Sequence, residues 1–142
     1  MDAAGYSGTP LAQKLGLKDG QRVLFLGLPE SLAELAAARA FATVARHGTD
    51  EAAAAGADWD LVHVFLTARA VLETLAPLLM RVIRRDGTIW VSWPKKASKV
   101  ATDVTEDVIR EVVLPLGLVD VKVAAVDPVW SGLKLVIRKE LR

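Results

Sequence analysis

Residues 22–28 read RVLFLGL, an apolar run that begins with one arginine and contains a glycine near its end. Apolar runs without alternation are typical of strands buried on both faces, as in a parallel sheet covered by helices. Residues 60–67 (DLVHVFLT) and 88–93 (TIWVSW) have the same character, and 41–45 is a shorter candidate strand. Helical patterns at 30–38 and 68–84 separate these strands. The alternation predicts right-handed strand–helix–strand units in one parallel sheet.

The last third of the chain predicts a different closure. Residues 103–113 have apolar residues at helical spacing, and Asp103 with Glu106 has the form of a capping box. Residues 119–126 and 133–138 alternate apolar with polar, which indicates an antiparallel pair at a sheet edge. We therefore expect an α/β fold with three layers, doubly wound and Rossmann-like, that ends in an antiparallel hairpin. One domain would span residues 1–142, with 1–10 as an N-terminal arm.

Composition limits the function classes. The 142 residues include 52% hydrophobic residues, which suits a sheet covered on both faces, yet no apolar run is long enough for a membrane span. There is no cysteine, which excludes disulfides and thiolate metal sites. The net charge is only +1, so the chain shows no strong nucleic-acid signal and any anion recognition must be local. The N-terminus has no secretory pattern, and we expect a cytoplasmic protein.

The order of elements resembles that of the class I S-adenosylmethionine methyltransferases, with the hairpin at 119–138 matching the closing hairpin of that family. The resemblance implies a methyltransferase-like fold and S-adenosylmethionine as the cofactor. In the family, the first strand ends in an acid and a G-x-G-x-G loop, whereas residues 26–30 here read LGLPE. The family's second strand ends in an acid that holds the ribose; residues 45–47 here read ARH, with Asp50 or Glu51 as substitutes. Between Arg46 and Asp60 there is too little chain for the family's additional helix and strand.

Three segments also resemble a small bacterial family named domain of unknown function 3052: residues 4–11 (AGYSGTPL), 93–96 (WPKK) and 130–134 (WSGLK). This second resemblance covers nearly the full chain. It implies the same reduced fold and supplies no activity.

The strongest candidate site follows the strand at 88–93. It consists of Trp93, Lys95, Lys96, Ser98 and Lys99, which offer ammonium groups and a hydroxyl to an anion beyond the carboxyl end of a strand. The alternative is a solvated basic turn whose tryptophan packs in the core. Arg69 would reach the same edge and could hold a carboxylate with two hydrogen bonds. Thr67 would also reach it, or would cap the long helix.

Other candidates are weaker. Ser7 and Thr9 in the N-terminal arm could fold over a ligand, or the arm could pack on the sheet. His63 lies among valines and reads as a buried, hydrogen-bonded histidine, and two distant histidines form no metal pattern. Neither a nucleophile elbow nor a Walker loop is present. Asp103 and its acidic neighbours read as helix capping.

These observations favour a non-catalytic binding or scaffold module, although they do not decide whether the protein is an enzyme. It would recognise an anionic small molecule or a protein partner at the carboxyl ends of the parallel strands. The alternative is a divergent S-adenosylmethionine-dependent methyltransferase, and a second alternative is a homodimeric structural protein. Metal ions are not expected, and a cofactor is expected only in the methyltransferase interpretation.

Overall fold

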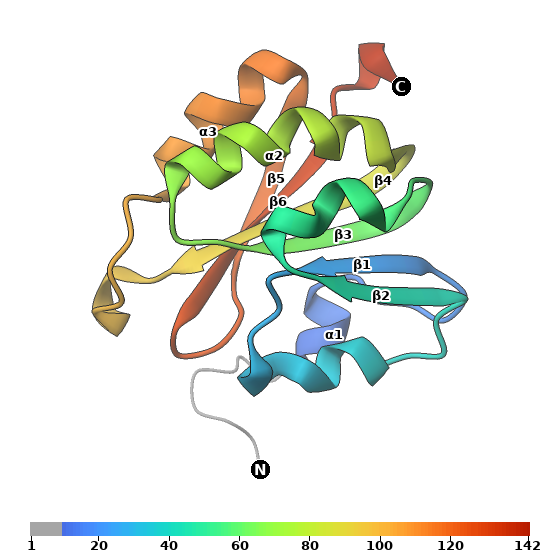
Figure 1. Cartoon of the computed structure of the whole chain (residues 1–142), viewed down its shortest axis with the longest axis horizontal. Coiled ribbons are helices and arrows are strands. Elements are labelled where there is room, and N and C mark those ends of the chain that lie inside the picture. Colours follow the sequence, from blue (N-terminus) through green and yellow to red (C-terminus); the bar gives the residue numbers. More distant parts are fainter. Residues whose placement is uncertain (1–9) are drawn as a thin grey trace.

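A computed structural model describes residues 10–142, in which one six-stranded sheet runs in the order β2-β1-β3-β4-β6-β5 (Figure 1). The strands are β1 (Arg22–Leu26), β2 (Thr43–His47), β3 (Trp59–Phe65), β4 (Ile83–Pro94), β5 (Leu118–Ala125) and β6 (Trp130–Ile137). Strands β2, β1, β3 and β4 are parallel, and β6 is antiparallel to both β4 and β5. The predicted fold class, with its closing antiparallel hairpin, is confirmed.

Helices cover both faces of the sheet. α2 (Arg69–Val82), α3 (Glu106–Val113) and the 3₁₀ helix η2 (Thr49–Ala55) lie on one face, and α1 (Leu11–Lys14) and the 3₁₀ helix η1 (Glu30–Ala37) lie on the other (Figure 1). Short 3₁₀ turns complete the set: η3 (Lys96–Ser98), η4 (Leu114–Leu116) and η5 (Lys139–Leu141). Within residues 10–142, no helix has the length and apolar character that crossing a bilayer requires.

The central strands are buried on both faces, as their unbroken apolar runs predict. Successive side chains of a strand point to opposite faces, so β3 contributes Val62 and Val64 to the core under α2 and Leu61 and Phe65 to the core under α1. Trp90 of β4 is fully buried and its indole N–H donates to the carbonyl of Leu15 at 2.9 Å. This bond fastens the N-terminal helix to the sheet.

One local prediction is confirmed and one is wrong. The alanine-rich residues 51–57, whose sequence predicts either a linker or a weak helical turn, belong mostly to the 3₁₀ helix η2, in which Ala52 packs in the core. The Asp86–Gly87 pair does not stop a helix: α2 ends at Val82, and the pair lies inside β4, where the register with β3 is irregular. Gly87 is buried there, and a Cβ on it would lie 2.8 Å from the Ile83 side chain.

Strand β5 forms an outer edge of the sheet, where a homodimer of the predicted kind could form. Val121 and Val123 are 52% and 44% exposed, which leaves apolar side chains in water. The register with β6 shifts between Asp120 and Lys122, so Val121 forms a bulge. Bulges and charged residues are common at strand edges that do not pair with another chain. The homodimer stays a prediction, and sedimentation would test it.

Candidate functional site

The carboxyl ends of the parallel strands meet at one edge of the sheet, on the left in Figure 1. From β1 the chain crosses to β2 on one side, and from β2 it crosses back to β3 on the other side of β1. The strand order therefore reverses between β1 and β3, and ligands of open α/β sheets bind in the crevice at such a point. The residues that follow these strands are 27–30, 48–51 and 66–69.

The turn after β1 is closed against the rest of the protein. Gly27 has φ of +71°, and a Cβ there would lie 2.7 Å from the carbonyl oxygen of Phe65 and 3.3 Å from the methyl group of Thr49. The N–H of Gly27 donates to the carbonyl of His47 at 2.8 Å. This glycine is thus required by the packing of the chain on itself. Leu28 follows it in place of a second small residue.

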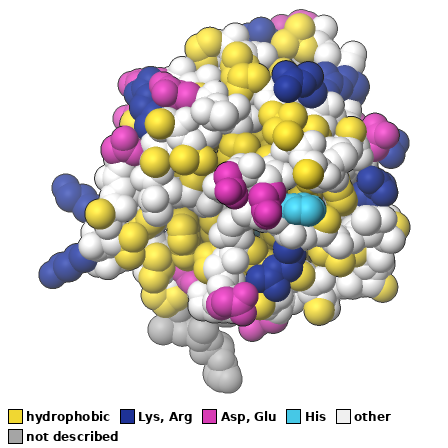
Figure 2. All heavy atoms as spheres, in the orientation of Figure 1, with side chains coloured by type: hydrophobic (Ala, Val, Ile, Leu, Met, Phe, Trp, Pro, Cys, Tyr) yellow, Lys and Arg dark blue, Asp and Glu magenta, His cyan; other side chains and the backbone are white. Residues whose placement is uncertain are grey.

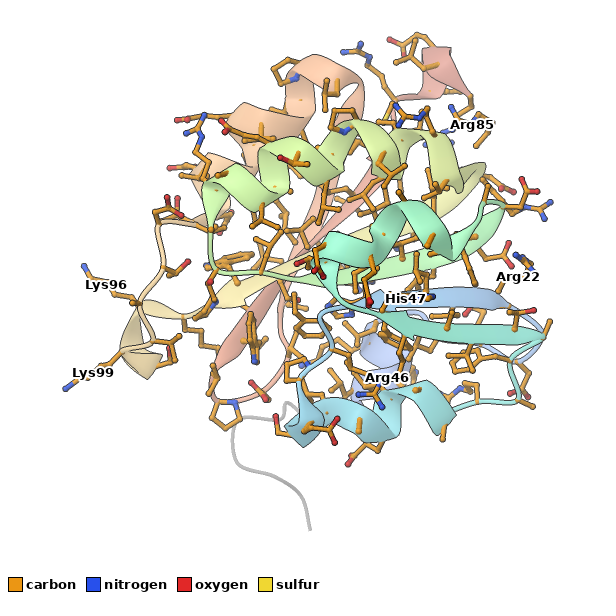
Figure 3. The ribbon with its side chains drawn as sticks, viewed as in Figure 1. Arg22, Arg46, His47, Arg85, Lys96 and Lys99 are labelled. Carbon is orange, nitrogen blue, oxygen red and sulfur yellow. The ribbon has the colours of Figure 1, made fainter. Side chains whose placement is uncertain are left out.

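Acidic residues come just after β2. Glu51 accepts a hydrogen bond from the N–H of Gly48 at 3.0 Å and so caps the start of η2. Asp50 is exposed, and no hydrogen bond to its side chain is found within residues 10–142. His47 reaches the surface at the end of β2, and acidic side chains border it (Figures 2 and 3). Of the two acids expected as substitutes for the family's ribose-binding residue, Asp50 is the one without a structural bond.

Beside the crevice lies a recess of about 320 Å³ between η2 and α2. Thr49 and Asp50 of η2 form one wall. The other wall consists of residues from the first two turns of α2: Ala70, Val71, Thr74 and Leu75. The recess thus combines apolar walls with two hydroxyls and one carboxylate.

The segment after β3 is tied down by the loop before α3. The carbonyl of Thr67 accepts from the Thr102 hydroxyl at 2.6 Å and from the N–H of Asp103 at 3.3 Å. A carboxylate oxygen of Asp103 in turn accepts from the N–H of Arg69 at 2.7 Å. Asp103 therefore caps α2, whereas the N-cap of α3 is Thr105. The predictions that Thr67 caps the long helix and that Asp103 starts α3 are both wrong, because the partners of these groups come from distant segments.

Arg69 does hold carboxylates, but they belong to the protein itself. Its guanidinium lies 3.1 Å from Glu73 and 2.7 Å from Glu111, on α2 and α3. These hydrogen bonds raise the pKa of Arg69 above its usual value. The two glutamates thus engage Nε and Nη1 of the guanidinium.

The basic segment after β4 reaches the same edge. Trp93 is 8% exposed and packs in the core under α2. The hydroxyl of Ser98 donates to the carbonyl of Lys95 at 2.7 Å, which closes its own turn. Lys96 and Lys99 extend away from the body of the protein (Figure 3). Their role in binding an anion stays a prediction, as do the roles of Ser7 and Thr9, which lie outside the described residues.

His63 is confirmed as a core histidine. Its Nε2 lies 2.7 Å from the Ser92 hydroxyl, and its ring stacks on Phe65 at 4.2 Å between centroids. Burial lowers its pKa to about 3, so it is neutral at physiological pH. Nδ1 finds no hydrogen-bond partner in the part of the chain that is described. His63 is therefore not available at the surface as a base.

Two kinds of chemistry find no support among the described residues. Within residues 10–142, no three His, Asp or Glu side chains gather as a metal site would require. Glu106 and Asp107 pair with Arg110 on their own helix, so they do not form an acid–base pair. The recess between η2 and α2 was not predicted from the sequence, since the alanine-rich segment of η2 fits a linker as well as a weak helical turn and carries no sign of a binding site.

Comparison with known proteins identifies the fold. No family model matches the chain, and no curated protein does either, so the resemblance to domain of unknown function 3052 stays a prediction. Among solved structures, a SAM-dependent methyltransferase from Aquifex aeolicus matches with a TM-score of 0.67 at 15% identity, covering 89% of this chain and 87% of that one. A TehB-like SAM-dependent methyltransferase from Corynebacterium glutamicum matches with 0.57 at 15% identity, covering 95% and 91%.

A third structure contains the cofactor. Fibrillarin from Aeropyrum pernix, in complex with natively bound S-adenosyl-L-methionine, matches with a TM-score of 0.54 at 12% identity, covering 89% of this chain and 73% of that one. Identities of this size establish architecture and not activity. The chain has the Rossmann-like fold of the S-adenosylmethionine-dependent methyltransferases.

Proposed function

We propose that this protein binds S-adenosylmethionine at the carboxyl edge of its sheet, as a divergent member of the methyltransferase fold. The observation that carries the proposal is the recess between η2 and α2, which lies beside the point where the strand order reverses. The solved structures that share the fold support this reading over a scaffold without a cofactor.

The recess suits the adenosine part of the cofactor. Val71 and Leu75 offer an apolar wall for a purine ring, and the carboxylate of Asp50 can accept hydrogen bonds from ribose hydroxyls. Asp50 follows β2 by three residues, close to where the family places its ribose-binding acid. A volume of about 320 Å³ is at the small end of ligand sites, which fits a nucleoside better than the entire cofactor.

The fit is weaker for the methionine part. The family closes a glycine-rich backbone turn on the cofactor, whereas Gly27 here is followed by Leu28 and Pro29. Proline has no N–H to donate, and leucine adds bulk where a close approach is needed. When bound, the cofactor would supply a methyl group on a sulfonium, and the residues at this edge would hold and orient it. No described residue is assigned as a base.

Calorimetry with the full chain tests the proposal. We expect micromolar binding of S-adenosylmethionine and of its demethylated product. Asp50→Asn should weaken both by about tenfold, the size of one lost hydrogen bond to a charged group. Val71→Trp should abolish binding, because the larger side chain fills the recess. Glu34→Gln, which removes an exposed acid from η1 on the opposite face, is the matched control. Absence of binding by the unmodified chain at millimolar cofactor contradicts the proposal.

A second candidate is the non-catalytic module that recognises an anionic molecule at the rim formed by Thr67, Arg69 and residues 93–99. The observation in its favour is that no acidic partner of Lys96 or Lys99 is found among residues 10–142. Titration with inorganic phosphate and with a dicarboxylate separates the two candidates. Binding that is lost in the double variant Lys95→Ala, Lys96→Ala and kept in Asp50→Asn would support this rim.

A further inference from the structure

A cavity larger than the recess lies at the opposite end of the sheet from the crevice. It has a volume of about 460 Å³ and lies at the amino ends of the parallel strands, the end of the sheet at which Figure 3 labels Arg22. Five of its twelve lining residues are charged. They are Lys18, Asp19, Asp60, Asp86 and Lys134. Ligands of open α/β sheets bind at the carboxyl ends of the strands, so the fold does not predict a ligand at this end. The charged residues here are therefore considered one by one.

Two lysines oppose each other directly on the sheet beside the cavity. Lys134 of β6 pairs with Lys122 of β5, so their side chains point to the same face. Like charges in this position destabilise a sheet. No acid that bonds to either ammonium group is found within residues 10–142. Lys134 also lines the cavity together with Lys18. An anionic group in the cavity near Lys134 would relieve this repulsion.

The carboxylates of the cavity are not equivalent. One oxygen of Asp60 accepts from the N–H of Arg22 at 2.8 Å, and the other lies 3.5 Å from the guanidinium of Arg84. Asp19 accepts from the N–H of Ala40 at 2.8 Å. These two acids are held by the chain itself. Asp86 has no bonded partner within the described residues, so its charge is available to a cationic group.

We propose that this cavity binds a small zwitterion of the α-amino acid class. The carboxylate of the ligand would lie toward Lys134 and Lys18, and its ammonium group toward Asp86. The hydroxyl of Thr88, which also lines the cavity, can serve either group. A ligand with a single charge would pair with either the lysines or Asp86 but not with both, so the site would prefer zwitterions to singly charged molecules. The site is separate from the proposed cofactor site, since it occupies the other end of the strands.

The test is a titration of the isotope-labelled full chain followed by amide chemical shifts. The probes are L-norvaline, which carries both charges, valerate, which lacks the ammonium group, and butylamine, which lacks the carboxylate. We expect saturable shifts around Gly16 and Gly87 with norvaline, and affinity at least tenfold lower for each single-charge analogue, equivalent to about 1.4 kcal/mol.

Variants localise the effect. Lys134→Met and Asp86→Asn should each weaken norvaline binding at least tenfold. Lys139→Met, at an exposed lysine of η5, should leave it unchanged, and so should Asp50→Asn at the cofactor recess. Lys134→Met also removes the like-charge pair, so the variant should be as stable as the unmodified chain, and lost binding then does not reflect unfolding. Equal affinity for norvaline and valerate, or no saturable shift with any probe, overturns the proposal.

Discussion

The two ends of the sheet differ in a way that the fold class does not predict. At the carboxyl end, segments far apart in the chain are in close contact. Gly27 has no room for a side chain, and Asp103 accepts a hydrogen bond from the first N–H of α2. At the amino end, a Cβ on Gly16 or Gly20 in the turns before β1 would meet nothing within 4 Å, whereas one on Gly87 would lie 2.8 Å from Ile83, and the cavity is larger. The end expected to bind ligands has the smaller of the two hollows, about 320 Å³ against about 460 Å³.

This difference shows that the place of a crevice in the fold does not by itself determine how much room the crevice has for a ligand. Strand order alone places the crevice at the carboxyl end. Whether that crevice is open depends on contacts between segments far apart in the chain, such as Thr67 with Thr102. The guanidinium of Arg69 likewise already pairs with Glu73 and Glu111. Substitutions at one end of the sheet, or in the strand between the two ends, can therefore show whether the ends differ.

The largest expected effect compares two glycines. Gly27→Ala combines a left-handed φ with a contact of 2.7 Å to a backbone oxygen that cannot move freely, and we expect it to lower the free energy of unfolding by about 3 kcal/mol. Gly20→Ala has the same conformational cost without a contact, and should lower it by about 1 kcal/mol. Urea denaturation measures both. Equal losses would show that the turn after β1 is no more crowded than the turn at Gly20.

The next effect concerns the middle of β3. His63 has a pKa of about 3 in the folded chain and an ordinary value of 6.5 when unfolded, so only the unfolded chain takes up a proton between these values. Its ring contacts Phe25, Phe65 and Trp90, and no charged group is among these contacts. Stability should therefore fall as the pH falls from 6.5 toward 3, with a loss of about 2 kcal/mol between pH 7 and 5.

The control for this pH dependence is His63→Phe, which keeps an aromatic ring in the same layer and has no titratable group. Unfolding curves at pH 7 and pH 5 should differ less in this variant than in the unmodified chain. The same acid sensitivity in both proteins would assign it to groups at the ends of the sheet instead.

A smaller effect is expected from the cap of α2. Asp103→Ala removes the acceptor of the Arg69 N–H, and loss of a helix cap costs about 1 kcal/mol. Asp86→Ala at the amino end removes a carboxylate without a bonded partner among residues 10–142, and should change stability by less than about 0.5 kcal/mol. Thermal unfolding compares the two. A larger loss of stability for Asp86→Ala than for Asp103→Ala would mean that the Asp86 carboxylate stabilises the fold. That result would also count against its proposed role in binding a zwitterion.

The smallest effect is expected at the basic turn after β4. Lys96→Ala with Lys99→Ala should leave the free energy of unfolding within about 0.5 kcal/mol, since both side chains extend into solvent. Denaturation in the presence of phosphate adds a second readout. A stabilising effect of phosphate that disappears in the double variant would support anion binding at this turn.

The positions and types of the strands could be predicted from the sequence more accurately than the binding sites. The apolar run at 22–28 and the alternation at 133–138 predict strand type correctly, because burial on two faces or one is written directly in the order of residues. Local signals failed where a distant partner competes. Asp103 has the sequence context of a cap for its own helix, yet it caps α2, which begins thirty-four residues earlier.

The sequence by itself determined the architecture of this protein, its lack of thiol chemistry and the core position of His63. These follow from composition and from periods of two and 3.6 residues, which act over a few neighbours. Only the tertiary structure decided that Arg69 is paired, that Gly27 is enclosed, and that Lys18, Asp86 and Lys134 line one cavity. Such groupings depend on which strands and helices pack together. The packing is set by the free energy of the whole chain, so it cannot be deduced from the residues of any single segment.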